Sequence, residues 1–132
     1  MSCNSAIYTV MNTPASVLAG GVVPLGAIIR RFGCALDLNG NGIIARAFGY
    51  YTADVNLTVQ PVAAGAISAT LYVDGAAYPG ATATATATAA GDDVQLVIPA
   101  LIRNAFDGLH TLTVILSAEA TVTNAAVTVA KA

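Results

Sequence analysis

The stretch Gly49–Gly80, GYYTADVNLTVQPVAAGAISATLYVDGAAYPG, decides the fold, because apolar and polar residues alternate along two of its runs. Every second residue is apolar from 51 to 59, and the same alternation returns from 67 to 73. A period of two is typical of β-strands that bury one face. We expect these runs to form a β-hairpin that feeds a third strand through a tight turn at Asp74-Gly75.

Further short runs of the same kind lie on both sides of this stretch. They cover residues 5–11, 27–32, 35–39, 43–48, 81–90, 94–101, 109–118 and 121–129. We expect the first run to lie at a sheet edge, a turn at Asn39–Gly42 and a β-bulge near Asn124, where the alternation loses its phase. About eight to ten short strands without an amphipathic helix predict an all-β protein, an antiparallel β-sandwich of the jelly-roll type.

The length bounds the organisation of the chain. A chain of 132 residues fits one domain with a real hydrophobic core. We expect a single jelly-roll domain over 1–132, in which 1–34 form an N-terminal edge strand and arm and 35–132 form the sandwich.

Charge is scarce along the whole chain. Hydrophobic residues make up 56% and charged residues 9%, against about 25% charged in an ordinary soluble domain. Abundant alanine explains part of this, and burial of surface against identical copies is the other explanation. A net charge of −2 with five scattered basic residues predicts no binding to nucleic acid or membranes.

The N-terminus and the cysteines allow predictions of cellular location and of cofactor binding. Residues 1–10 lack a basic region followed by an apolar one, so we expect synthesis in the cytoplasm without a Sec signal. Cys3 and Cys34 are expected to stay reduced, although they could pair. Neither belongs to a metal-binding pattern, and we expect no cofactor.

Catalytic patterns are not evident. His110 is the single histidine, and a structural role for it is favoured over that of a general base, because no nucleophile motif accompanies it. The segment Asp37–Gly42, DLNGNG, is similar to a calcium loop but lacks the closing glutamate, so a plain turn is favoured. We expect no enzymatic activity.

Tyrosines offer an alternative function. With no tryptophan present, half-buried strand positions are favoured for them over a sugar-stacking platform. If the chain is instead a carbohydrate-binding module, the candidate glycan-binding residues are Tyr50, Tyr72 and Tyr78.

The order of motifs resembles a known superfamily. Gly49-Tyr50-Tyr51, the run from Leu71 to Gly75, Pro79-Gly80-Ala81, a Gly-Asp turn and two final alternating strands follow one another in the chain. This order resembles the jelly roll of the tumour necrosis factor and complement superfamily, in the short bacterial form at the tip of collagen-like spore-surface glycoproteins. The chain departs from that form in lacking a Gly-X-Y stalk. Its N-terminal third looks like the opening of small phage and prophage proteins.

The resemblance implies assembly as a trimer about a three-fold axis, with an apolar seam. We therefore expect a non-enzymatic structural protein, a homotrimer located on a phage virion, as head decoration or fibre, or on a bacterial surface, with an adhesive role there. Its expected partners are itself, other virion proteins and a surface glycan. Alternation alone selects as candidate seam residues Tyr51, Val55, Leu57, Leu112, Val114 and Leu116, some of which must instead fill the core.

Overall fold

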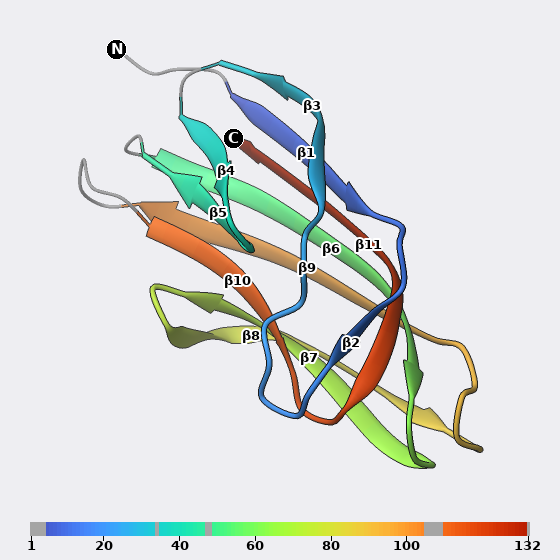
Figure 1. Ribbon diagram of the computed structural model, residues 1–132. Coiled ribbons are helices and arrows are strands. Elements are labelled where there is room, and N and C mark those ends of the chain that lie inside the picture. The colour runs from blue at the N-terminus through green and yellow to red at the C-terminus, as the bar shows by residue number, and fades with distance from the viewer. Residues whose placement is uncertain (1–4, 34, 47–48, 105–109, 132) are drawn as a thin grey trace.

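The computed structural model describes residues 5–33, 35–46, 49–104 and 110–131, and in these residues it contains strands and no helix. Two antiparallel sheets lie face to face (Figure 1). The first sheet consists of β1 (Ala6–Met11), β2 (Ala15–Val17), β3 (Ala27–Phe32), β6 (Gly49–Pro61), β9 (Val94–Asn104) and β11 (Ala120–Lys131). The second consists of β4 (Leu36–Asn39), β5 (Gly42–Ala45), β7 (Gly65–Val73), β8 (Ala76–Ala87) and β10 (His110–Leu116).

In both sheets, many neighbouring strands are not consecutive in the sequence. The first sheet has the order β3-β1-β11-β6-β9, with β2 paired to the far end of β11, and the second has the order β4-β5-β10-β7-β8. Strands that are far apart in sequence therefore lie side by side, as β6 and β11 do along almost their whole length (Figure 1). The predicted all-β antiparallel sandwich is confirmed.

One core lies between the sheets. Along β6 the alternation expected from the sequence is strict, so that every second side chain is buried and the intervening ones face outward. The inward faces of both sheets contribute to a single cluster of buried apolar residues. Its largest fully buried members include Tyr51, Ile7, Leu36, Leu57, Leu71, Leu96 and Ile98.

The hairpin expected between the two central runs is wrong. β6 pairs with β11 and β9 in the first sheet, whereas β7 pairs with β10 and β8 in the second. The short link at 62–64 carries the chain across the sandwich, and each strand meets the core from the opposite side. Alternation is the same for a strand in either sheet, so it could not distinguish these arrangements.

The predicted turns and the bulge are confirmed. Asp74 and Gly75, with φ of 54° and 83°, connect β7 to β8 in the left-handed conformation that a two-residue hairpin requires. Asn39 pairs with Gly42 across the second predicted turn. The register between β11 and β6 shifts between Val122 and Asn124, where a bulge was expected.

The N-terminal strand was expected at an edge, and this is wrong. β1 lies between β3 and β11, and the edge position belongs to β3, whose side chains are all exposed. Ser5 and Lys131 lie together at one end of the sandwich, where the Lys131 N–H donates to the Ser5 carbonyl oxygen at 2.8 Å. Cys3 and Cys34 lie outside the described residues.

Candidate functional site

The single histidine, His110, contacts the β7–β8 turn through Asp74. His110 Nδ1 lies 2.5 Å from Asp74 Oδ2, and Asp74 Oδ1 accepts a hydrogen bond from the Thr111 N–H at 2.9 Å. The Thr111 bond, followed by hydrogen bonding and attraction from His110, holds the pKa of Asp74 below its ordinary value, against a raising effect of partial burial. Asp74 and His110 therefore tie the β7–β8 turn to the start of β10, and in the described residues His110 has no recorded bond to a hydroxyl nucleophile.

The other carboxylates serve turns and ion pairs. Asp92 accepts hydrogen bonds from the Thr88 hydroxyl and the Ala89 N–H at 2.7 and 3.1 Å, which caps the β8–β9 turn. Asp37, in the segment that resembled a calcium loop, lies 3.7 Å from a guanidinium nitrogen of Arg46. In the part of the chain that the structure describes, no three His, Cys, Asp or Glu side chains gather as metal ligands, and no helix is long and apolar enough to cross a membrane.

The six side chains selected as seam candidates fill the core of a single subunit. Each is at most 3% exposed, and each lies on the inward face of β6 or β10. A side chain enclosed by its own subunit has no exposed surface with which to contact a partner. The six residues are Tyr51, Val55, Leu57, Leu112, Val114 and Leu116.

The outward face of the β3-β1-β11-β6-β9 sheet, here called the outer A face, is poor in charge. Its lateral rows follow from the strand registers, and the middle of the face carries alanine, threonine and asparagine. Arg30, Asp54 and Arg103 are its charged members in the described strands. The three principal rows are Phe32-Ala6-Ala130-Thr52-Leu101, Arg30-Tyr8-Thr128-Asp54-Pro99 and Ala27-Val10-Ala126-Asn56-Val97.

Large apolar groups stand at both ends of the outer A face. At the β3 end Phe32 is 62% exposed and, with Tyr8, lines an apolar hollow of about 80 Å³. At the β9 end Val97 and Leu101 are 53% and 54% exposed. The face therefore has two different apolar patches, and between them lie Ala130, Thr128 and Ala126 of β11 and Thr52, Asp54 and Asn56 of β6.

The three tyrosines selected as glycan-binding candidates do not gather. Tyr50 lies on the outer A face, where the Arg103 guanidinium sits 5.9 Å from its ring centroid. Tyr78 packs against the core, and its hydroxyl donates to the Leu101 carbonyl oxygen at 2.6 Å. Tyr72 lies on the outward side of the second sheet.

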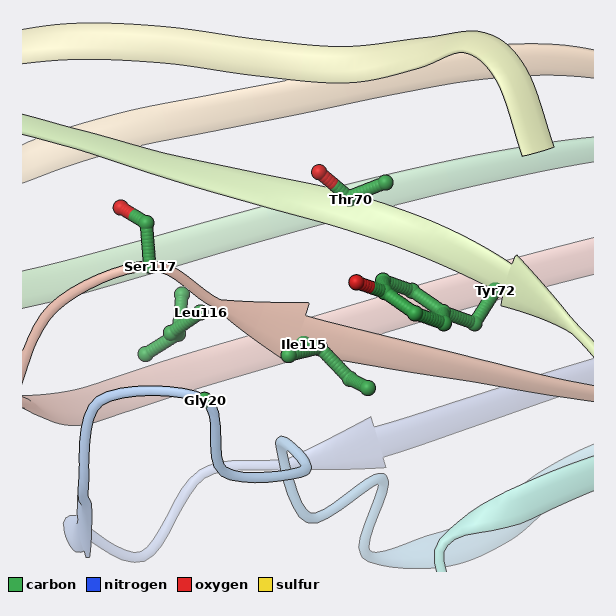
Figure 2. A pocket seen from close by; sticks show the side chains of 6 residues that line it. All are labelled: Gly20, Thr70, Tyr72, Ile115, Leu116 and Ser117. Atoms are coloured by element: carbon green, nitrogen blue, oxygen red, sulfur yellow. The ribbon is translucent and has the colours of Figure 1, made fainter. Parts of the chain in front are cut away.

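Tyr72 lines a groove on that outward side. Figure 2 shows its ring between β7 and β10, with Thr70 and Ser117 on the same side. The groove has a volume of about 200 Å³ and lies beside the loop that contains Gly20. Its lining consists of Gly20, Thr70, Tyr72, Ile115, Leu116 and Ser117.

The comparison with solved structures concerns the whole sandwich. Murine APRIL, in a crystal structure at pH 5.0, superposes with a TM-score of 0.75 at 10% identity, covering 98% of this chain and 99% of APRIL. The globular domain of zebrafish complement 1qA superposes with a TM-score of 0.70 at 9% identity, covering 95% of this chain and 94% of that domain. The fold is a tumour necrosis factor-like jelly roll. The resemblance stated from the sequence motifs is thereby confirmed at the level of fold.

A third structure extends the comparison to a particle protein. The PRD1 vertex protein P5 superposes on the jelly roll with a TM-score of 0.50 at 18% identity, covering 99% of each chain. No family model matches the sequence, and no curated protein matches it either.

Sequence reasoning missed the exposed residues of the outer A face and those of the groove around Tyr72. Phe32 and Leu101 were not selected because alternation marks two faces of a strand without saying which one is buried in the subunit. Thr70 and Ser117 gave no signal, because single hydroxyl residues on strands are common. The loop at 18–22 lies beside these residues because of its backbone hydrogen bonds to β10, which is far away in the sequence.

Proposed function

We propose that the chain is a non-enzymatic structural protein that assembles as a homotrimer through the outer A face. The single observation that carries the proposal is the character of this face, which is five strands wide and has large exposed apolar side chains at both ends, with Arg30, Asp54 and Arg103 as its charged residues in the described strands. Exposed large apolar side chains grouped on one face of a subunit are typical of a protein–protein interface. The tumour necrosis factor-like fold supports the same reading, since the resemblance implies trimers.

The distribution of apolar groups favours head-to-tail contact. A two-fold interface brings one patch against its own copy, whereas contact between two different patches closes into a ring when the rotation allows. Here the β3 end offers Phe32 beside an apolar hollow, and the β9 end offers the projecting side chains of Val97 and Leu101. We infer that the β9 end of one subunit packs against the β3 end of the next.

The particle to which such a trimer belongs is the finer part of the proposal. Likeness to a vertex protein supports a place on a virion, as head decoration or fibre, and a bacterial surface is the alternative. An adhesive role there would involve other virion proteins or a surface glycan as partners. Genes for capsid, portal or tail proteins beside the gene for this chain would support the virion; a neighbourhood of unrelated metabolic genes would contradict it.

The assembly is tested by light scattering and native mass spectrometry at micromolar concentration. The expected result is a trimer, and a strict monomer would overturn the proposal. Leu101→Glu and Phe32→Lys should each dissociate the trimer, because each leaves an unpaired charge in an apolar contact, at a cost of several kcal/mol. Thr84→Glu adds the same negative charge as Leu101→Glu, but on the outward face of the second sheet, and it should leave the trimer intact.

The double variant decides the geometry. If Leu101 of one subunit meets Phe32 of the next, Leu101→Glu combined with Phe32→Lys places opposite charges in every contact and restores the trimer in part. If like ends meet, Glu faces Glu and Lys faces Lys, so the double variant dissociates further than either single one.

A further inference from the structure

We propose that the groove around Tyr72 binds one ring of a neutral sugar, a pyranose unit. The groove lies on the outward side of the β4-β5-β10-β7-β8 sheet, opposite the outer A face. It is complete within one subunit, so this inference does not require the trimer.

The walls of the groove are built before any ligand arrives. The Gly20 N–H donates to the Leu116 carbonyl oxygen at 2.8 Å, and the Leu116 N–H donates to the Gly21 carbonyl oxygen at 3.2 Å. Val23 continues this pairing with Val114 at 2.7 Å, and Val22 bridges to Ile115. The loop therefore runs along β10 almost as an extra strand, and a pre-formed wall lowers the entropic cost of binding.

The lining combines an aromatic ring with hydroxyl groups. Thr70 and Tyr72 are two residues apart on β7, so they share its outward face, and Thr70 lies opposite Ile115 on β10. In Figure 2 the Tyr72 ring extends along the strands with its hydroxyl end on the side of Ser117. Such an apolar surface with a few oriented polar groups is typical of sites for small neutral molecules.

The hydroxyl groups retain hydrogen-bonding capacity for a ligand. Ser117 Oγ accepts the Ser68 N–H at 2.9 Å, which leaves its own hydrogen free to donate. Thr70 and Thr82 share one hydrogen bond at 3.0 Å, and whichever hydroxyl donates, Thr70 Oγ1 keeps a lone pair that can accept a hydrogen bond from a ligand. No hydrogen bond from the Tyr72 hydroxyl is recorded to any described residue. These groups would meet the hydroxyls of a sugar ring while its C–H face packs on Tyr72.

Charge and size narrow the class of ligand. Among the described residues no acidic or basic side chain lines the groove, so none of them would compensate the charge of an ionic ligand. Its volume of about 200 Å³ suits one ring rather than a chain of sugars. In a trimer joined through the outer A face, three such grooves would face outward, and a multivalent glycan would gain avidity from them; that gain rests on the proposed assembly.

The experiment uses NMR titration of the isotopically labelled full chain with a panel of neutral monosaccharides. At about 10 mM sugar, above the millimolar range expected for a one-ring site, amide shifts should change at β7, β10 and the Gly20 loop. Tyr72→Ala should weaken binding at least tenfold, and Tyr72→Phe, which keeps the ring and the fold, two- to fivefold. Tyr50→Ala is the matched control on the opposite face and should bind as the wild type does.

Two results would overturn the inference. One is the absence of shift changes around Tyr72 with every sugar of the panel, and the other is binding that survives Tyr72→Ala. Binding should also be insensitive to salt, because the described lining of the groove carries no charged group. A strong salt dependence would point to an ionic ligand and contradict the neutral class. A monomeric protein that binds sugar would contradict only the proposed trimer. A trimer that does not bind sugar would contradict only the proposed sugar site.

Discussion

Tyr78 donates its phenolic hydrogen to the backbone carbonyl oxygen of Leu101 at 2.6 Å, and this bond joins the edge strand of one sheet to the edge strand of the other. β8 ends the second sheet and β9 ends the first, so the sandwich is held closed along this side. The same residue that presents its side chain on the outer A face thus anchors its backbone to the opposite sheet.

Removing this hydroxyl should loosen the closed side. Tyr78→Phe keeps the packing of the ring but loses the bond, so we expect the free energy of unfolding to fall by about 1 kcal/mol. Urea denaturation followed by fluorescence measures the change. Tyr50→Phe is the control, because no hydrogen bond from its hydroxyl is recorded to the described residues, and an equal loss in both variants would contradict the role of the bond.

Gly26 is required by both conformation and space. Its φ is +76°, and a Cβ there would lie 2.2 Å from the Val10 carbonyl oxygen. Gly26→Ala should therefore lower the free energy of unfolding by at least about 2 kcal/mol, since backbone strain and a clash add together. Gly20 has the same φ with nothing within 4 Å of its Cβ position, so Gly20→Ala measures the conformational part alone, about 1 kcal/mol. Equal losses in the two variants would contradict the close contact with Val10.

Thr9 buries a hydroxyl group without a partner. The residue is 0% exposed, and its Oγ1 has no hydrogen-bond partner among the described residues. Thr9→Val keeps the shape and removes the buried polar atom, so we expect an increase in the free energy of unfolding of about 1 kcal/mol. Thermal unfolding provides the measurement, with Thr9→Ser as the opposite change, which keeps the hydroxyl and loses a methyl group. Destabilisation by Thr9→Val would mean that the hydroxyl has an unseen partner.

Asp74 should make the protein sensitive to acid. Because its pKa is lower in the folded than in the unfolded state, the unfolded chain binds more protons at acid pH. The stabilisation is complete above the ordinary carboxyl pKa of about 4 and is lost as the pH falls through the lower folded value. Asp74→Asn still accepts the Thr111 N–H, and its stability should change less between neutral and acid pH. Parallel pH profiles of the two proteins would contradict this role.

Leu57 and Val97 separate the core from the proposed contact surface. Leu57 is fully buried in the subunit, so Leu57→Ala should lower subunit stability by about 2 to 5 kcal/mol. Val97→Ala should leave the unfolding of the isolated subunit within about 0.5 kcal/mol and weaken the trimer instead. Chemical denaturation and concentration-dependent light scattering distinguish the two effects. A trimer unaffected by Val97→Ala would shift the contact away from the β9 end.

Local patterns in the sequence predicted the strands well and their partners poorly. The alternation along β6, the Asp74-Gly75 turn and the bulge before Asn124 depend on neighbouring residues, and all three are present. Pairing depends on which sheet a strand enters, so the expected hairpin between β6 and β7 failed. Residue periodicity carries no information about that choice.

The candidate site was beyond sequence reasoning for a related reason. Alternation showed that Leu57 and Leu112 each lie on the apolar face of a strand. It could not show whether that face packs against the other sheet or against another subunit. The groove depends on hydrogen bonds between the Gly20 loop and Leu116, which are almost one hundred residues apart in the chain. Of the groove lining, Tyr72 was selected from the sequence as a glycan contact, because an aromatic residue in a strand is conspicuous by itself, whereas Leu116 was selected only for the seam.

The meeting of Ser5 and Lys131 makes the sandwich a natural candidate for circular permutation. Because these residues are hydrogen-bonded neighbours in space, a short covalent linker could join them without disturbing either sheet. New termini could then be opened at the exposed turn around Gly91, at the opposite end of β6. Tags fused beside Ser5 or Lys131 and tags fused near Gly91 would therefore project from opposite ends of the sandwich, so the choice of fusion site sets the direction of display.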